Sequence, residues 1–367
     1  MIYLDTNATA PLRPCAREAW LASYDNAWAN PGSIHGDGQH ARFVLDEAKR
    51  TLARLLGAKS SELVLTSGGT EANGLALSQA SRIAVSAVEH SSVLRAAPEA
   101  IRLPVDAKGR VQLDTLSPDT DLVACQFANN ETGILQDVPT LCAAIRGRAP
   151  NAKILVDACQ GTGKAALNVA TLGADFVSIA GHKFGAPKGC GLLWVRNGTR
   201  IAPLLRGGRQ QQDRRSGTED PALAAAMAAA LTEATTQLAS EENRQRYLLA
   251  TCFAQIQRAL AAARWIGYDA PCLANTLSLG HPGLSNEILV QRLDLRGICV
   301  SVGAACMAGK GEPSHVIAAL GVAPELARSI IRVSINWQTT ATELATFAEA
   351  YISEVRDLNR MPHGPTS

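Results

Sequence analysis

Residues 153–195 read KILVDACQGTGKAALNVATLGADFVSIAGHKFGAPKGCGLLWV and contain three short apolar runs, at 153–159, 174–180 and 191–195. Gly, Asn, Pro or Asp residues bound these runs, and this pattern predicts buried β-strands. The polar groups QGTGK and GHK follow the first and second runs directly. In a parallel sheet, ligand-binding groups lie on the loops beyond the carboxyl ends of the strands. The stretch therefore predicts an α/β fold with a binding site on one side of its sheet.

The same pattern continues toward the N-terminus. Three more apolar runs, at 62–66, 82–88 and 121–127, are followed by the polar groups SGGTEAN, EHSS and ANNETG. Strands that alternate with helical segments form mostly parallel sheets buried between helices. Polar groups thus follow five predicted strands. We expect these loops to meet at one edge of the sheet and to form a single site.

A second domain is expected after an Ala-rich helix. The charged segment SEENRQR, at 240–246, marks the passage into it. We expect a large domain at 13–240 and a smaller α/β domain formed by 1–12 and 241–367. Three later apolar runs predict further strands, with helices between them: 277–280, 298–303 and 330–336.

The composition argues against several classes of protein. The chain has 367 residues, of which 47% are hydrophobic and 19% charged, as expected for a globular protein with a large core. The formal net charge is only +2 and no basic stripe is present, so nucleic-acid binding is not expected.

The N-terminal residues carry an acid, Asp5, and lack the pattern of a signal peptide. The longest uncharged apolar run, 221–231, is well short of the ~20 residues that span a bilayer, so no membrane association is expected. We expect a cytoplasmic protein whose nine cysteines are reduced. No two of them form a CxxC pair, so no metal site is expected.

A phosphate-binding turn is a candidate at SGGTEAN, between a predicted strand and a predicted helix. Gly68 and Gly69 allow a tight turn, and the amides of the first helical turn then face outward. The hydroxyl of Thr70 adds a donor. By itself, such a turn also fits a simple helix start.

Asp157 and Lys183 suggest the chemistry of the site. Asp157 ends a run too apolar to be exposed, so its carboxylate needs a cationic partner, either a protonated pyridine nitrogen or an arginine. Gln160 lies on the same loop. Lys183 is either a solvated charge or an amine that forms a Schiff base with an aldehyde. A phosphate cradle, an acid for a ring nitrogen and an imine-forming lysine together are what pyridoxal phosphate (PLP) requires.

Four more residues are candidates, each with an alternative. His90 can stack on a ring and move protons, or can cap a helix. His182, next to Lys183, can donate to phosphate. Arg332 lies in a predicted strand and suits either a substrate carboxylate or a salt bridge between domains. Cys306 lies in a Gly-rich segment typical of a nucleophile, and a structural cysteine is an equal alternative.

With these residues assembled, the chain resembles the cysteine desulfurases of the NifS/IscS group, in class V of the fold-type I PLP-dependent transferases. That resemblance implies a large domain with a mostly parallel seven-stranded sheet and a smaller α/β domain. It extends over nearly the whole chain, in the family's order. The motifs that carry it are YLDTNATAP, NPGSIH, TSGGTEAN, EH, NNETG, DACQGTGK, GHKFGAPKGCG, RSGTED, SVGAACMAG, EPSHVIAALG and IRVSIN.

The resemblance implies a role for each residue near the cofactor ring. Lys183 would hold PLP as a Schiff base, Asp157 would pair with the pyridinium nitrogen, and Gln160 would contact the ring hydroxyl. His90 would stack on the ring. Asn130 would lie beside both cofactor and substrate.

The resemblance also implies a phosphate site built from two subunits. Gly69, Thr70 and His182 would bind the phosphate within one subunit, and Thr218 would reach it from the neighbouring subunit of a homodimer. Many relatives have a serine at the position of Ala180, so one phosphate donor is lost here.

Substrate binding and sulfur transfer are implied by motif position as well. Arg332 would hold the carboxylate of L-cysteine. Cys306 would attack the substrate sulfur, leaving alanine and a persulfide. The persulfide would pass to an acceptor, either an iron–sulfur scaffold protein or a carrier for thio-cofactor synthesis or tRNA thiolation. Cys306 would be the only residue expected to contact a metal, as a transient ligand of an iron–sulfur cluster. A selenocysteine lyase, another class V enzyme or a non-catalytic sulfur-relay protein stay open as alternatives.

Overall fold

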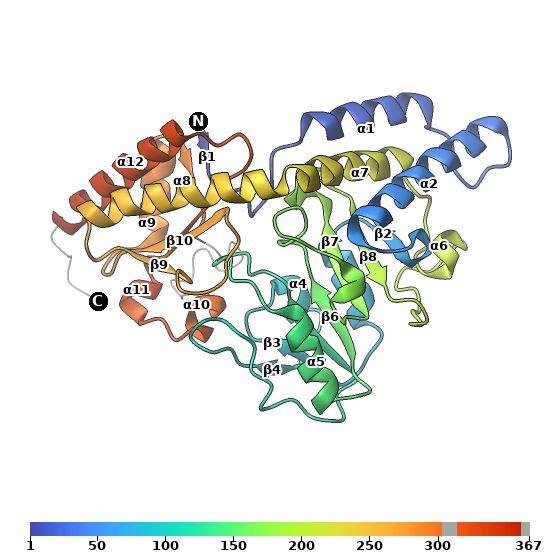
Figure 1. Cartoon of the computed structure of the whole chain (residues 1–367), viewed down its shortest axis with the longest axis horizontal. Coiled ribbons are helices and arrows are strands. Elements are labelled where there is room, and N and C mark those ends of the chain that lie inside the picture. Colours follow the sequence, from blue (N-terminus) through green and yellow to red (C-terminus); the bar gives the residue numbers. More distant parts are fainter. Residues whose placement is uncertain (303–313, 361–367) are drawn as a thin grey trace.

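A seven-stranded sheet forms the centre of one half of the molecule (Figure 1). The computed structural model describes residues 1–302 and 314–360. The strand order in this sheet is β2-β8-β7-β6-β5-β3-β4. Its strands are β2 (Leu63–Thr66), β3 (Ile83–Ser86), β4 (Ile101–Leu103), β5 (Leu122–Gln126), β6 (Lys153–Asp157), β7 (Phe176–Ala180) and β8 (Gly191–Val195).

Six of the seven strands lie where the apolar runs predict them, and the sheet is mostly parallel. Strand β8 runs antiparallel to both of its neighbours, β2 and β7. The loop between β7 and β8 is too short for the crossover helix that a parallel connection needs, so the chain turns back. Strand β4 was not predicted, because it is a short edge strand with two exposed residues followed by Pro104.

Helices cover both faces of this sheet. Alternate residues of a strand point to opposite faces, so Ile154 and Val156 join one core and Leu155 joins the other. The first core includes residues of α1 (Pro14–Asn26), α2 (Gly36–Leu56), α5 (Val138–Arg148) and α7 (Pro221–Thr236). The second core includes residues of α3 (Gly69–Leu77) and α4 (Ser91–Leu94). The short helix α6 (Gln210–Asp213) precedes α7 in the chain.

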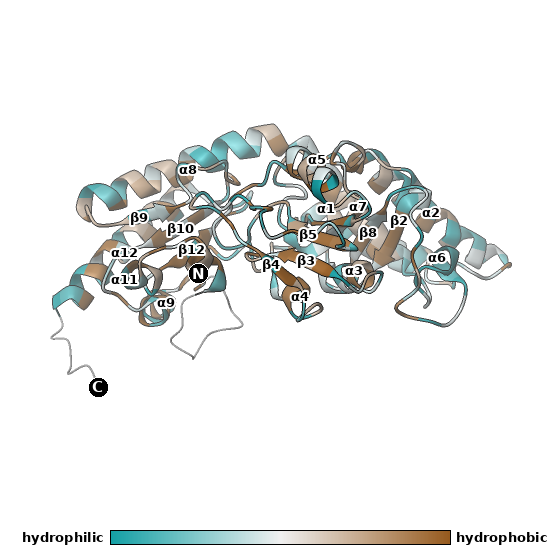
Figure 2. Cartoon of the chain, turned by 90° about the horizontal axis from the view of Figure 1, so that it is seen from below, coloured by the Kyte–Doolittle hydropathy of each residue, from teal (hydrophilic) through white to brown (hydrophobic). Residues whose placement is uncertain are grey.

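The other half of the molecule has a smaller sheet and its own core (Figure 2). Three antiparallel strands have the order β12-β10-β9, and β1 pairs with β11 in parallel. These strands are β1 (Ile2–Tyr3), β9 (Arg264–Ile266), β10 (Thr276–Gly280), β11 (Ile298–Cys299) and β12 (Ile331–Ser334). The helices here are α8 (Leu238–Ala259), α9 (Asn286–Leu295), α10 (His315–Ala319), α11 (Pro324–Ala327) and α12 (Ala341–Arg360).

The N-terminal segment 4–13 joins the two halves. The amide of Thr6 donates to the carbonyl of Ser334 in β12, while the amide of Ala10 donates to the carbonyl of His182, after β7. The segment therefore passes between the smaller sheet and the carboxyl end of the larger one. Among the helices described in 1–302 and 314–360, none has the length and apolar character to cross a membrane.

Candidate active site

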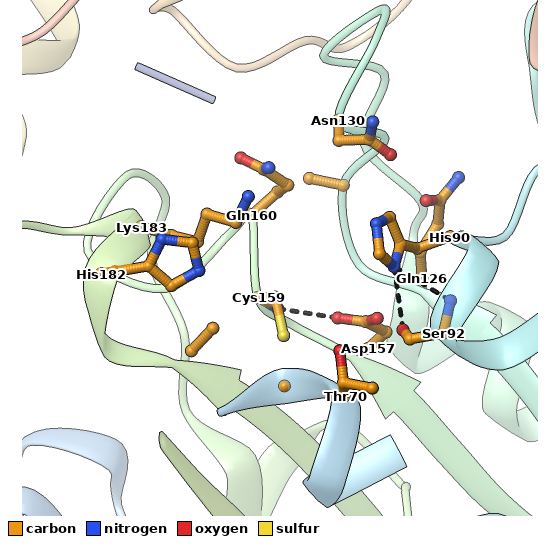
Figure 3. Close-up of a pocket in the computed structure, with 13 residues that line it drawn as sticks. Thr70, His90, Ser92, Gln126, Asn130, Asp157, Cys159, Gln160, His182 and Lys183 are labelled. Carbon is orange, nitrogen blue, oxygen red and sulfur yellow. Dashed lines mark hydrogen bonds between the residues drawn. The ribbon is translucent and has the colours of Figure 1, made fainter. Parts of the chain in front are cut away.

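A cavity of about 230 Å³ lies at the carboxyl ends of β5, β6 and β7 (Figure 3). Loops that follow five strands of the larger sheet contribute to its wall, as the sequence pattern predicts. Eight of the candidate residues line it together. The lining residues are Gly69, Thr70, His90, Ser92, Gln126, Ala128, Asn130, Asp157, Cys159, Gln160, Ala180, His182 and Lys183.

One end of the cavity is formed by the first turn of α3. Gly68, the residue before this helix, has a φ of +154°, which only glycine adopts readily. A Cβ atom on Gly69 would overlap the Sγ atom of Cys159, so any other residue there would force Cys159 or the helix to move. Thr70 and Ala180 line the same cavity. The backbone amides of this turn are placed to bind an anion, with the Thr70 hydroxyl beside them.

Asp157 ends β6 at the floor of the cavity, and 7% of its surface is exposed. Its carboxylate accepts hydrogen bonds from the side chain of Asn73 at 2.8 Å and from the amide of Cys159 at 2.9 Å. Within residues 1–302 and 314–360, no arginine forms an ion pair with it. The carboxylate is thus oriented by neutral donors, and this disfavours the arginine alternative.

Lys183 lies opposite Asp157, in a short turn after β7 (Figure 3). Its Nζ atom donates to the backbone carbonyls of Asn7 at 2.7 Å and Ala8 at 3.0 Å. Burial lowers the pKa of this amine to about 8, and the positive charge of Arg332 contributes to the shift. The uncharged fraction of the amine near neutral pH is therefore much larger than that of an exposed lysine, and the uncharged form is the nucleophile toward an aldehyde.

Both predicted histidines face the cavity in a largely neutral form. His90 is the N-cap of α4: its Nδ1 atom accepts from the amide of Ser92 at 3.1 Å. It therefore caps a helix and lines the cavity as well, and burial lowers its pKa. The Nδ1 atom of His182 lies 3.1 Å from the Thr9 hydroxyl. Burial lowers the pKa of His182 to about 4, and the positive charge of Lys183 contributes to this shift.

Arg332 is buried in β12, with 4% of its surface exposed. It forms an ion pair with Asp5 at 2.6 Å and donates to the backbone carbonyl of Asn130 at 3.0 Å. Arg332 therefore does form a salt bridge, but its partner Asp5 lies in the N-terminal segment assigned to the same small domain, so this pair is not the salt bridge between domains that was the alternative. The contact to Asn130 also places the guanidinium beside the cavity wall.

Of the predicted site residues that the structure describes, Arg332 and Thr218 are not among those lining this cavity. Thr218 lines a different cavity, together with Asn30, Arg42 and Arg209. Cys306 lies outside the described residues.

Several residues at the site were not assigned a role from the sequence, and three of them make or border its hydrogen-bond network. Asn7 is 1% exposed, and its carbonyl accepts from both Lys183 and Gln160. Lys164 donates to the side-chain oxygen of Gln160. Cys159 lines the cavity. Membership of the motifs YLDTNATAP and DACQGTGK was the available signal for all three.

The donor set of this cavity fits PLP. The amides and hydroxyl at the start of α3 suit its phosphate, Asp157 suits its ring nitrogen, and the amine of Lys183 suits its aldehyde. The overlap that excludes a side chain at Gly69 keeps the phosphate end of the cavity open for such a ligand.

Comparisons with known proteins agree with this fit. The family model "Aminotransferase class-V" matches residues 2–347. A cysteine desulfurase of Cereibacter sphaeroides is 38% identical, covering 95% of this chain and 94% of that protein. The cysteine desulfurase IscS of Dictyoglomus turgidum is 34% identical, and the match covers 94% of this chain and 91% of that protein. A solved NifS-like protein superposes with a TM-score of 0.89 at 28% sequence identity, and the match covers 97% of this chain and 99% of that one.

The fold and the site define a class V aminotransferase, a PLP-dependent protein of fold type I. The matched relatives extend over nearly the full length of the chain at more than 30% identity. The chain belongs to the cysteine desulfurase family.

Proposed function

We propose that this chain is a PLP-dependent cysteine desulfurase. It converts L-cysteine to L-alanine and holds the sulfur as a persulfide on Cys306, from which an acceptor such as an iron–sulfur scaffold protein takes it. The observation that carries the proposal is the single cavity that unites Lys183, Asp157, His90 and Gln160 with the first turn of α3.

When bound, PLP supplies an electron sink that lets a bond to the substrate's Cα atom break. Lys183 anchors the cofactor aldehyde, because its pKa of about 8 leaves a reactive amine. Asp157 keeps the ring nitrogen protonated. His90, whose pKa is lowered by burial, accepts or returns a proton at the cavity wall.

Arg332 binds the substrate carboxylate through its guanidinium, which Asp5 and the carbonyl of Asn130 hold in place. The sulfur atom of Cys306 then bonds to the substrate sulfur as the substrate Cβ–S bond breaks. The electron pair of that bond stays with the substrate carbon, which takes up a proton and leaves as alanine. The balance is one cysteine and one thiol giving one alanine and one persulfide.

The working assembly in this proposal is a homodimer. Large apolar side chains are exposed on α1, α2 and the loop between them: Tyr24, Trp28, Ile34 and Phe43 are 64%, 72%, 93% and 58% exposed. The same loop shares a cavity with Thr218. A second copy packed on this face would cover the apolar residues and bring its own Thr218 to the phosphate site.

Two further parts of the proposal concern organisation and location. The separate hydrophobic core built from residues 248–355, together with Leu4, supports a small domain of 1–12 and 241–367 beside a large domain of 13–240. The eight cysteines of the described ranges are all free thiols, which supports a cytoplasmic location.

The test is to incubate the purified protein with PLP and L-cysteine, measure alanine, and map the persulfide by mass spectrometry. We expect one alanine per sulfur transferred, with the persulfide on Cys306. Cys306→Ser should abolish sulfide release and keep the visible band of the bound cofactor, whereas Lys183→Ala should lose reducible covalent attachment. Unchanged sulfide release in Cys306→Ser would refute the persulfide route.

The dimer is tested separately by light scattering. Ile34→Asp places a charge on the apolar face and should give a monomer that binds PLP more weakly. Thr218→Ala should keep the dimer and weaken PLP binding alone. A parent protein that is monomeric and binds PLP at full affinity would refute the two-subunit phosphate site.

A further inference from the structure

A second lysine lies behind the cavity wall, next to Lys183. Lys164 follows β6 in the segment DACQGTGK, four residues after Gln160. Its Nζ atom donates to the Oε1 atom of Gln160 at 2.8 Å and to the Oδ1 atom of Asn7 at 3.0 Å. Lys164 therefore bridges the side-chain amides of a cavity residue and of the N-terminal segment.

These two contacts decide which way each amide points. An amide side chain has an acceptor at one end and a donor at the other, so a donor bound to the oxygen directs the NH₂ group elsewhere. With Oε1 bound to Lys164, the Nε2 atom of Gln160 donates to the Asn7 carbonyl at 2.8 Å and has a second N–H to offer. With Oδ1 bound to Lys164, the NH₂ group of Asn7 donates to the Thr276 hydroxyl at 2.8 Å and the Asn130 carbonyl at 3.2 Å.

Asn7 connects these hydrogen bonds to Lys183, the lysine proposed to hold the cofactor. Its backbone carbonyl accepts from the Gln160 amide and from Lys183 at once. Its backbone amide donates to the Ser334 hydroxyl at 2.9 Å, and its Oδ1 atom also accepts from Asn275 at 3.0 Å. Any rotation of the Gln160 or Asn7 amide would therefore leave buried partners unpaired, which is costly.

The surroundings of Lys164 favour its uncharged form. Burial lowers its pKa well below the ordinary value of 10.5, and the charges of Lys183 and Arg332 lower it further. On its other side it lines a small cavity that Arg13, Glu241 and Glu242 also line. An uncharged amine has two N–H groups, which match the two oxygens that accept from it.

We propose that Lys164 is a positioning residue for the PLP site. By holding the oxygens of Gln160 and Asn7, it keeps the Gln160 NH₂ group available as a donor to the cofactor's ring oxygen. The inference rests on the proposed function, because the acceptor it serves belongs to PLP.

The test is the pH titration of the visible absorbance band of the PLP-loaded protein. A donor to the ring oxygen stabilises its anionic form, so losing that donor raises the midpoint of the titration. We expect Gln160→Ala to raise it, and Lys164→Met to raise it by about 0.5–1 pH unit. In the Gln160→Ala background, Lys164→Met should add no further shift, since the group it positions is gone. The control Lys108→Met removes an exposed lysine and should leave the midpoint unchanged.

Lys164→Gln serves as the conservative variant, because its amide keeps a donor at this position. We expect it to return the midpoint toward that of the parent, and it also provides the measurement if Lys164→Met does not fold. Thermal unfolding of each PLP-loaded variant reports stability separately from the midpoint.

Each outcome points one way. A Lys164→Met protein with the parent's midpoint and a lower melting temperature has lost only packing, and this overturns the positioning role. If Lys164→Met shifts the midpoint equally in the parent and in the Gln160→Ala background, the shift is a direct charge effect, and this also overturns the positioning role. A parent protein that forms no visible band with PLP refutes the proposed function instead.

Discussion

Gly69 offers a quantitative test of the phosphate end of the cavity. It is the first residue of α3, and a Cβ atom added there would lie well inside 3.0 Å of the Sγ atom of Cys159. The next nearest atom, the Cβ of Ala180, would be 3.5 Å away, in ordinary contact. In Gly69→Ala, therefore, either the Cys159 side chain or the first turn of α3 must move.

The structure sets the size of the effect. Forcing one extra methyl group into a packed site costs about 1–3 kcal/mol. Alanine regains up to about 1 kcal/mol over glycine in a helix, so a net cost of about 1–2 kcal/mol is expected. If the strain displaces the amides that bind phosphate, the same free energy weakens PLP binding by about 5- to 30-fold.

The assay is PLP affinity by equilibrium dialysis, combined with urea unfolding. A double-mutant cycle with Cys159→Ala identifies the clash, since removing the Sγ atom removes the overlap. We expect Gly69→Ala/Cys159→Ala to recover most of the lost affinity, with a coupling of about 1–2 kcal/mol.

Gly74→Ala is the matched control on the same helix. A Cβ atom there would meet only the Leu204 side chain, at 3.8 Å, so this variant should keep full PLP affinity and gain slightly in stability. If Gly69→Ala binds PLP as the parent does, or if Cys159→Ala gives no recovery, the close approach of α3 to Cys159 does not shape the phosphate site.

Three further predictions follow from the charges at the site. Because burial lowers the pKa of Lys183 to about 8, the rate of PLP attachment to the apoprotein should rise between pH 7 and 9 with a midpoint near 8, measured by stopped-flow absorbance; a rate still rising steeply at pH 10 would contradict this. Burial and the charge of Asp157 raise the pKa of Glu89 well above its ordinary 4.5. The carboxyl group of Glu89 therefore binds its proton more tightly in the folded state than in the unfolded state. The stability that this protonated group contributes is present below about pH 4.5 and is lost as the pH rises. The parent's free energy of unfolding should fall relative to that of Glu89→Gln as the pH rises from 4.5, and the opposite slope in urea titrations would count against it. His182, whose pKa is about 4, acts as a neutral hydrogen-bonding group, so His182→Asn should lose less PLP affinity than His182→Ala, for which we expect a loss of about 5- to 10-fold; equal losses by dialysis would show that the hydrogen bond does not matter.

Much of the fold could be predicted from the chain itself. Apolar runs bounded by turn residues located six strands of the larger sheet, because a buried strand must be apolar on both faces. The rule that ligand groups follow the carboxyl ends of strands then brought Asp157, Lys183 and His90 into one site, and the cavity contains all three. Edge strand β4 and the reversed direction of β8 were not predicted, since neither depends on local hydrophobicity.

Contacts between segments far apart in the chain required the tertiary structure. The pairing of Asp5 with Arg332 joins residues 327 positions apart, and the Asn7 carbonyl that holds Lys183 lies 176 positions away. No local periodicity encodes such a contact, because it depends on where the N-terminal segment crosses the carboxyl end of the sheet. Residue types and their order along the chain specify the chemistry of this site. Packing alone determines that burial lowers the pKa of Lys183, that a side chain at position 69 would displace Cys159 or the first turn of α3, and that Lys164 reaches Gln160 and Asn7 together.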